Sequence, residues 1–307
     1  MTKRYLGLDL GGTYIKIAVI EEAPDGVRPT VVYSDKVRTG GAAGPEHVLD
    51  RLIAQGLKAF DLHGPFVGVG IGVPGLFDQA TGSIELLPNL PGPWEGFLLR
   101  DPIGDGLGMP ATMINDARAF TLAEGTVGAG RGASVMLGVT LGTGIGGGIM
   151  IDGKLHLGAF GFAGEFGHQT VDPTGPICGC GNRGCLEAVA KGSTIAAAAG
   201  VKNAEAAYAA AAAGDQGAIE ATESAAFFMA IAIANVVTVV GVDTVVLGGG
   251  IMSAGDQVLQ PLEAALAKRL TLVSAQEVTL VKAALGGHAG AIGAALAARV
   301  AGQTRSR

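Results

Sequence analysis

Short apolar runs alternate along this chain with longer segments of helical periodicity. Tyr5 to Leu10 and Phe66 to Val73 are almost uninterrupted runs of apolar residues and glycine, which is typical of buried strands. Between them, Glu46 to Phe60 repeats its apolar residues at the spacing of one helix face. The opening of the chain therefore predicts strands and helices in alternation.

The same pattern continues to the C-terminus. Further strands are expected at residues 15–20, 112–114, 135–141, 149–151, 244–247 and 277–283. Helices are expected at residues 117–125, 193–199, 202–213, 216–240, 261–269 and 290–301, with Ser193 as an N-cap. Strands and helices that alternate over the whole chain predict an α/β fold.

A glycine turn, Gly11-Gly12-Thr13, separates the first two strands. Asp9 lies at the mouth of this turn and Lys16 lies near it. Glycines allow backbone N–H groups to approach phosphate oxygens, and the Thr13 hydroxyl can add a further contact. The stretch predicts either a phosphate-binding loop or an ordinary glycine-rich hairpin, and both alternatives stay open.

A second glycine run, Gly142 to Gly148, follows the strand expected at 135–141 and contains a literal G-x-G-x-x-G. A dinucleotide-binding loop of this type requires a helix after the glycines. The residues that follow, IMIDGKL, predict a strand and a turn instead. We therefore interpret the run as a second copy of the first hairpin, and Gly248 to Gly250 as a third glycine turn.

Polar residues mark two further places. Asn115 and Asp116 stand where the strand at 112–114 gives way to a helix, a position that suits a helix N-cap as well as a binding or catalytic pair. The irregular segment LLPNLPGPWEGF supplies Asn89 as a candidate pocket residue. Its Trp94 is expected to pack in the core.

All cysteines of the chain lie in one short segment that also contains a histidine: His168, Cys178, Cys180 and Cys185. One imidazole and three thiolates form a closed tetrahedral set for a structural Zn²⁺. Free cysteines are usually small buried hydrophobes, but C-x-C with a third cysteine close behind is a metal spacing. Glu165 and Glu187 flank this zinc loop, so a bound metal would hold both carboxylates in place.

Composition and charge exclude several classes. The chain has 307 residues, 49% of them hydrophobic, so a large core is available. The net charge of −6 argues against binding to nucleic acid or to an anionic membrane surface. The N-terminus turns polar too early for a signal peptide, and the apolar stretch AFFMAIAIANVV is too short to span a bilayer. A reducing cytoplasm is the expected location.

Together these motifs resemble the ROK family, named for repressors, open reading frames and kinases, whose members are mostly sugar kinases. The resemblance runs from Leu6 to about Ala298 and includes, in family order, LGLDLGGTYIKIAVI, IGVPG, NLPG, NDA, GVTLGTGIGGGIMIDGKL, GEFGH, CGCGNRGCLEA, VVLGGGI and AGAIGAA. It implies an actin-like ATPase fold, as in hexokinases, with two similar α/β domains around a central cleft. Residues 1–117 with 287–307 would form the smaller domain, and residues 118–286 the larger domain with the zinc loop. The resemblance also implies a homodimer or higher homo-oligomer.

By position, the resemblance implies ATP- and Mg²⁺-dependent phosphorylation of a hexose. The general base would be Asp116, and the sugar would be bound by Asn89, Asn115, Asp116, Glu165, His168 and Glu187. His168 would contact the sugar with one ring nitrogen and zinc with the other. The nucleotide would be bound by Asp9, Gly11, Gly12, Thr13, Lys16, Thr143, Gly144, Gly248 and Gly249.

The expected sugar is D-glucose, phosphorylated at its 6-hydroxyl, because a wholly polar set of sugar-binding groups discriminates against a missing or misplaced hydroxyl. Two departures bear on this choice. Ile114 stands where glucokinases of the family often carry an acidic residue, and Arg118 where they often carry a small polar one. Kinases for N-acetylmannosamine, N-acetylglucosamine, mannose and fructose share nearly all the motifs. A sugar-sensing protein without catalysis is the remaining alternative, although no helix-turn-helix or basic segment is seen ahead of the first strand.

Overall fold

The computed structural model describes residues 2–23 and 28–305 and divides into two compact units. The first unit comprises Met1–Val127 together with Gly287–Arg307. The second comprises Gly128–Gly286. The first unit therefore continues past residue 117, where the sequence led us to expect a boundary.

The helix that follows residue 115 explains this difference. Helix α3 (Asp116–Val127) packs against the C-terminal helix α9 (Ala289–Arg305). A Cβ on Gly293 of α9 would meet the carbonyl oxygen of Ala119 in α3, so the two backbones touch at this glycine. Contact this close makes α3 part of the unit that α9 completes.

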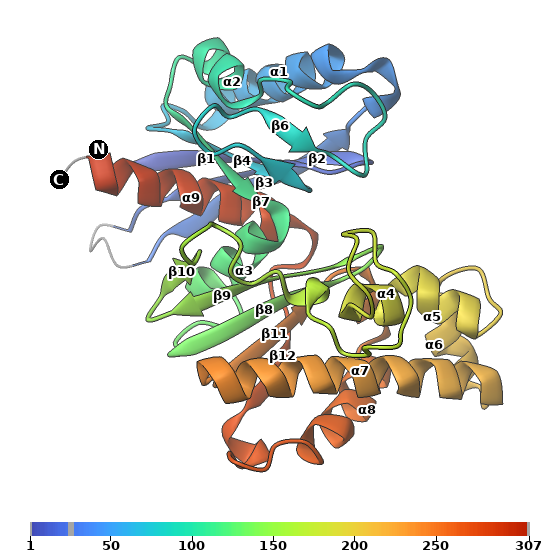
Figure 1. Ribbon diagram of the computed structural model, residues 1–307. Coiled ribbons are helices and arrows are strands. Elements are labelled where there is room, and N and C mark those ends of the chain that lie inside the picture. Colours follow the sequence, from blue (N-terminus) through green and yellow to red (C-terminus); the bar gives the residue numbers. More distant parts are fainter. Residues whose placement is uncertain (1, 24–27, 306–307) are drawn as a thin grey trace. The chain divides into compact units, whose positions relative to one another are not determined.

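The first unit is a five-stranded sheet with helices on both faces (Figure 1). The strand order is β3-β2-β1-β4-β7, in which β1, β2 and β3 are antiparallel neighbours while β1, β4 and β7 run parallel. Apart from α3 and α9, its elements are β1 (Arg4–Leu10), β2 (Tyr14–Glu21), β3 (Thr30–Arg38), α1 (Pro45–His63), β4 (Val69–Val73), β5 (Leu76–Phe77), β6 (Ile84–Leu86), α2 (Arg100–Leu107) and β7 (Ala111–Asn115).

Alternation along β1 decides what covers each face of this sheet. Leu6, Leu8 and Leu10 point to one side and are fully buried in a cluster with residues of α1 and α2. Gly7 points to the other side, where a Cβ would meet the carbonyl oxygen of Ala291 in α9. Because this position carries no side chain, α9 lies directly on the central strands.

The second unit repeats this sheet. Its order is β10-β9-β8-β11-β12, again an antiparallel group of three followed by two strands parallel to the central one. Its elements are β8 (Val135–Leu141), β9 (Ile145–Ile151), β10 (Lys154–His156), α4 (Leu186–Ala190), α5 (Gly192–Ala198), α6 (Ala204–Ala212), α7 (Gln216–Val240), β11 (Thr244–Gly248), α8 (Asp256–Ala267) and β12 (Thr279–Lys282). The expected duplication of the glycine hairpin is thus part of a duplicated sheet.

Helix α7 is the central helix of the second unit. It has 25 residues and is long and apolar enough to cross a membrane by length and composition alone. Ala225, Met229 and Ile233 are buried in the core of the unit, and the helix packs against α4, α6 and α8. Apolar side chains of this helix therefore contribute to the core of the second unit.

Elements that the sequence did not predict have weak local signals. The side chains of β3 are exposed or half-buried throughout, so the strand lacks a marked apolar pattern. Helix α2 contains Pro102 and two glycines, which have low helix propensity. In the folded unit, β3 is held by antiparallel pairing with β2, and α2 by burial of Ile103 and Leu107.

Three expected boundaries were wrong. The strand expected at 149–151 begins at Ile145, because the glycine run itself pairs with β8. Ser193 lies inside α5, whose N-cap is Lys191. Helix α8 begins at Asp256, ahead of Pro261, which lies within it.

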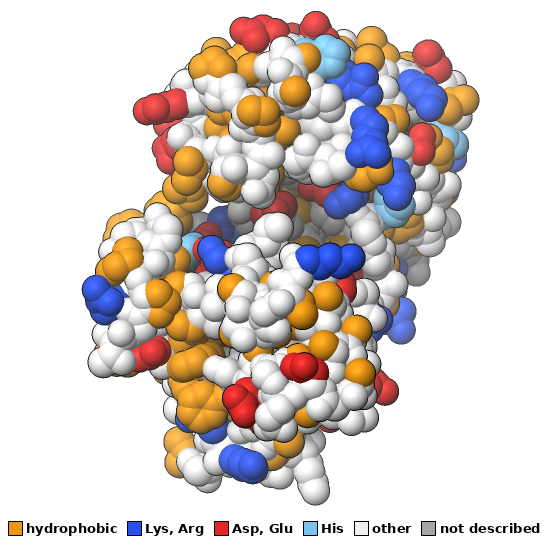
Figure 2. Space-filling model, turned by 90° about the vertical axis from the view of Figure 1, so that its right-hand side faces the viewer, with side chains coloured by type: hydrophobic (Ala, Val, Ile, Leu, Met, Phe, Trp, Pro, Cys, Tyr) orange, Lys and Arg blue, Asp and Glu red, His pale blue; other side chains and the backbone are white. Residues whose placement is uncertain are grey.

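The surface carries mixed charge. Acidic and basic side chains are intermixed on the face seen in Figure 2. Two basic residues gather on β3, where Lys36 Nζ and the Arg38 guanidinium lie 5.0 and 4.8 Å from the ring centre of Tyr14. These two cations lie at the end of β3 beside the first glycine turn.

Candidate active site

Three parallel strands of the first unit bring their carboxyl ends to one edge of its sheet. Asp9 of β1 lies beside Gly72 of β4, and Val73 of β4 lies beside Asn115 of β7. Neighbouring strands are about 4.8 Å apart, so the ends of β1 and β7 are separated by about 10 Å. The first glycine turn and the Asn115–Asp116 pair therefore leave the same edge, where ligands bind in open α/β sheets.

Asp9 and Lys16 face each other across the first hairpin. They are register partners, and Lys16 Nζ lies 3.2 Å from Asp9 Oδ2. Burial raises the pKa of Asp9, while the charge of Lys16 lowers it. The carboxylate also lies against the first turn of α9, where a Cβ on Gly290 would be 2.6 Å from Oδ2. Asp9 and Gly290 are far apart in the sequence, so no local pattern indicated this contact.

The turn Gly11-Gly12-Thr13 is held from two sides. The Thr39 hydroxyl donates to the Gly11 carbonyl at 2.6 Å, and the Thr39 N–H donates to the Thr13 carbonyl at 2.9 Å. Thr39 is fully buried, and no sequence pattern indicated its role. On the other side lies Asn89, because a Cβ on Gly12 would be 2.7 Å from the Asn89 carbonyl oxygen. The structure thus brings Asn89 to the first glycine turn.

Asn115 caps helix α3. Its Oδ1 accepts the N–H groups of Ala117 at 3.0 Å and Arg118 at 3.3 Å, and its Nδ2 donates to the Gly75 carbonyl at 3.3 Å. Asp116 is exposed, and its Oδ1 accepts the Ala117 N–H at 2.8 Å. The capping alternative is therefore correct for Asn115. It leaves Asp116 as an exposed carboxylate at the end of β7.

The second and third glycine turns lie side by side in the second unit. Gly248, at the end of β11, pairs with Thr140 of β8. A Cβ on Gly249 would meet the backbone of Leu141, the last residue of β8. Thr143 is exposed in the turn that follows Leu141. The structure therefore places these two turns at adjacent strand ends.

Glu187 lies against the second glycine turn. Its Oε2 accepts the Ile145 N–H at 2.9 Å, and a Cβ on Gly144 would be 2.5 Å from that oxygen. We expected Glu187 on the sugar side because of the resemblance. The sequence did not reveal that it also contacts the expected phosphate turn.

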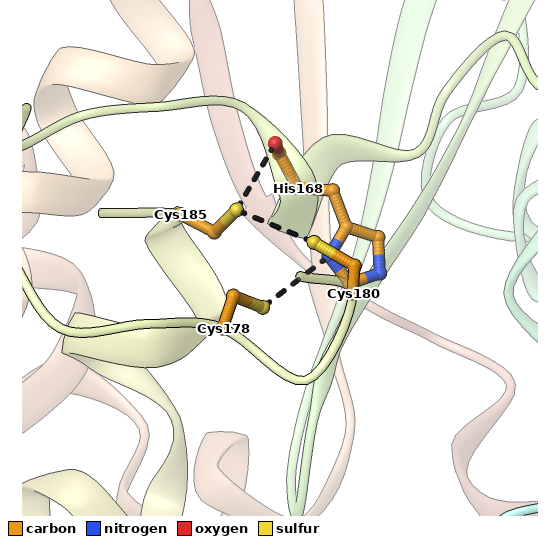
Figure 3. A group of neighbouring side chains, drawn as sticks. All are labelled: His168, Cys178, Cys180 and Cys185. Atoms are coloured by element: carbon orange, nitrogen blue, oxygen red, sulfur yellow. Dashed lines mark hydrogen bonds between the residues drawn. The ribbon is translucent and has the colours of Figure 1, made fainter. Parts of the chain in front are cut away.

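The four expected zinc ligands converge. The ligand atoms of His168, Cys178, Cys180 and Cys185 lie within 4.8 Å of one another, and their side chains point toward one centre (Figure 3). Cys178 Sγ is 3.7 Å from His168 Nδ1, and Cys180 Sγ is 3.7 Å from Cys185 Sγ. With Zn–S bonds of about 2.3 Å, the edges of a tetrahedral site are about 3.8 Å long. The donor set and its spacing fit Zn²⁺.

Burial distinguishes the three thiols. Cys178 and Cys185 are buried and Cys180 is exposed. Burial raises the pKa of Cys185 to about 12, whereas a backbone hydrogen bond from Asn182 lowers the pKa of Cys180. A divalent cation favours the thiolate form and would oppose the effect of burial on Cys185.

Glu165 and His168 bracket a short 3-10 turn, Phe166–His168. The His168 N–H donates to the Glu165 carbonyl at 3.1 Å, and both side chains are half-buried. Because Nδ1 of His168 faces the sulfur atoms, its other ring nitrogen points away from them. The geometry suits the expected use of one nitrogen for zinc and the other for a ligand.

Comparison with known proteins covers nearly the whole chain. The model of the ROK family matches residues 5–300. A glucokinase from Halalkalibacterium halodurans is 35% identical over 279 residues, which cover 84% of each chain. The crystal structure of a ROK hexokinase from Thermus thermophilus has a TM-score of 0.88 at 34% identity, covering 98% of this chain and 99% of that chain. That of a ROK family glucokinase from Streptomyces griseus with glucose and AMPPNP has a TM-score of 0.77 at 30% identity, covering 98% and 100%.

Relatives with other names match as well. An N-acetyl-D-glucosamine kinase from Pasteurella multocida is 34% identical and covers 94% of this chain and 97% of its own. A xylose repressor from Bacillus subtilis is 29% identical and covers 94% of this chain and 75% of its own. The comparisons confirm the expected actin-like fold of ROK hexokinases and leave the substrate to be argued from the residues.

Proposed function

This chain belongs to the ROK family and is an ATP-dependent sugar kinase, and we propose that it phosphorylates D-glucose at the 6-hydroxyl. The observation that carries this proposal is the shared edge of the first unit's sheet. A glycine turn suited to phosphate leaves the end of β1 there, and the exposed Asp116 follows the end of β7, with the two strand ends about 10 Å apart. Phosphoryl transfer needs these two functions near each other.

Asp116 is the proposed general base. It would accept the proton of the attacking hydroxyl as the sugar oxygen bonds to the γ-phosphorus and the bond to ADP breaks. It is the first residue of α3, so its carboxylate lies at the end of β7 where the helix begins. Asn115 uses its Oδ1 as a cap, but its amide has a second hydrogen that can bind a sugar hydroxyl.

The glycine turns are assigned to the nucleotide. Gly12 and Thr13 in the first unit, and the turns of Thr143-Gly144 and Gly248-Gly249 in the second, offer backbone N–H groups suited to phosphate or to the nucleoside. Gly11 shapes the first turn, since its own N–H donates to the Tyr14 carbonyl at 3.0 Å. Asp9 is the candidate to orient Mg²⁺ through water, with Lys16 holding the carboxylate. When bound, Mg²⁺ would neutralise charge on the phosphates.

The zinc loop is assigned to the sugar. Glu165, His168 and Glu187 are polar groups that pair with hydroxyls, and Asn89 adds a further amide. Zinc would play a structural role, because four protein ligands leave no position for an activated water. Its part is to fix the ring of His168. Since zinc needs reduced thiols, we also propose a cytoplasmic location, together with the homodimer or higher homo-oligomer that the resemblance implies.

Steady-state kinetics over a panel of hexoses tests the choice of sugar. We expect kcat/KM for glucose to exceed that for mannose and fructose, because a polar site discriminates against a misplaced hydroxyl. We also expect it to exceed that for N-acetylglucosamine and N-acetylmannosamine, because an N-acetyl group needs an apolar recess and the proposed sugar-binding residues are all polar. A higher value for any of the others would overturn the glucose assignment and leave the kinase intact. Sugar binding by calorimetry without ATP consumption would instead indicate a sugar-sensing protein.

A further inference from the structure

We infer that Glu187 is a positioning residue that fixes the second glycine turn for the nucleotide. This inference rests on the proposed function, because it takes the turn Gly142-Thr143-Gly144 as a phosphate contact. It adds to the sugar-binding role expected for Glu187 a second role on the ATP side. The contacts that support it all lie within the second unit.

Helix α4 and the first residue of α5 hold the two ends of this turn. At the start of the helix, Glu187 Oε2 accepts the N–H of Ile145, the residue after the turn, at 2.9 Å. Just beyond the end of the helix, the Gly192 N–H donates to the carbonyl of Gly142, the first residue of the turn, at 3.0 Å. Because the segment from α4 to the start of α5 binds the turn at its entry and its exit, it fixes the direction of the N–H groups between them.

The first hairpin shows why this support is needed. There, Asp9 and Lys16 form an ion pair across the two strands next to the turn. At the corresponding place in the second hairpin, Thr140 pairs with Gly146, which has no side chain. The second turn therefore lacks that cross-strand side-chain pair, and a carboxylate arrives from α4 instead.

Helix α4 is itself anchored to the zinc loop. Cys185, the residue before the helix, is fully buried, and its Sγ lies 3.3 Å from the His168 carbonyl oxygen. The Leu186 N–H donates to the Gln169 carbonyl at 3.0 Å. The zinc loop thus holds α4, and α4 holds the second glycine turn through Glu187. In this way the zinc loop supports the proposed nucleotide-binding turn as well as the proposed sugar-binding residues.

Nucleotide affinity measured without sugar tests this inference. Calorimetric titration of Mg²⁺–AMPPNP into Glu187→Ala should give a Kd about 10- to 100-fold weaker than in the wild type, because a hydrogen bond from the turn to a charged group is lost. Glu187→Gln keeps an oxygen that can accept the Ile145 N–H, so its Kd should stay near the wild-type value. Glu220→Ala is the matched control, since this exposed glutamate of α7 belongs to neither the sugar-binding nor the nucleotide-binding set, and its nucleotide Kd should not change.

The outcomes separate the two proposals. An unchanged nucleotide Kd in Glu187→Ala, with only glucose affinity reduced, would overturn the inference and leave the kinase standing. Failure of the wild type to bind the nucleotide would overturn the kinase proposal and this inference with it. If Glu187→Ala does not fold, amide exchange in the wild type without ligands decides. Protection of the Ile145 N–H supports the inference, and exchange as fast as that of exposed Thr143 contradicts it.

Discussion

The two units share one strand order but support their glycine turns differently. In the first unit, the turn after β1 is flanked by the ion pair of buried Asp9 with half-buried Lys16, both from the hairpin itself, and is held by Thr39 from the end of β3. In the second unit, the turn after β8 is flanked by Gly146 and held from outside by α4 and the start of α5. A duplicated hairpin can therefore specialise. One copy lies beside the proposed acid–base chemistry at β7, and the other is tied to a metal loop.

The largest effect is expected from removal of the proposed general base, which belongs to the first unit. Asp116→Ala should lower kcat by about 10²- to 10⁴-fold, because no carboxylate remains to take the hydroxyl proton. Glucose affinity should fall far less, since other polar groups also bind the sugar. Steady-state kinetics with calorimetric titration of glucose measures both. Turnover near the wild-type level would show that Asp116 is not the base.

The second prediction concerns removal of a proposed zinc ligand from the second unit. His168→Ala should lose stoichiometric zinc and lower the melting temperature, because the buried cysteines would no longer have a closed ligand set. Elemental analysis and thermal melting measure these effects. His156→Ala is the control, since this exposed histidine lies outside the cluster and should keep its zinc. Full zinc content in His168→Ala would contradict the assignment.

The third prediction concerns loss of the cationic partner from the Asp9–Lys16 ion pair of the first hairpin. Lys16→Met should destabilise the protein by about 1–3 kcal/mol at neutral pH, because Asp9 stays buried without its cationic partner. The pKa of Asp9, already raised by burial, should rise further. Since a carboxyl group with a raised pKa destabilises the fold only where it is charged, the deficit should shrink as pH falls through that pKa. Denaturant unfolding at several pH values measures this, and a deficit that grows at acid pH would contradict it.

The smallest effect is expected from removing helix caps, one in each unit. Asn115 caps α3 in the first unit, and Asp215 caps α7 in the second by accepting the Ala218 N–H at 2.8 Å. Asn115→Ala and Asp215→Ala should each cost about 1 kcal/mol of stability. Only Asn115→Ala should also raise KM for glucose. Equal KM values in both variants would mean that Asn115 is a cap alone.

Features carried by neighbouring residues could be read from the sequence. The zinc set depends on four residues in one segment, and the structure brings together the same four. The duplicated glycine hairpins were visible because each strand and its turn are continuous in the chain. Trp94 was correctly expected in the core, where it is 3% exposed.

Features made by distant residues could not be read in this way. Thr39 reaches Gly11, Gly290 reaches Asp9, and Glu187 reaches Ile145 only after the sheets have formed. Sequence patterns report local periodicity and say nothing of these approaches. The edge strand β3 was missed for a related reason, because its exposed side chains carry little apolar signal.

Direct observation of the product tests the central claim. Phosphorus NMR of the wild-type protein with ATP, Mg²⁺ and D-glucose should show a sugar phosphate monoester coupled to the C6 protons, formed in equal amount to ADP. A phosphate monoester at another position would contradict the assigned acceptor hydroxyl. Release of inorganic phosphate alone, or no consumption of ATP with any hexose, would contradict the sugar kinase itself.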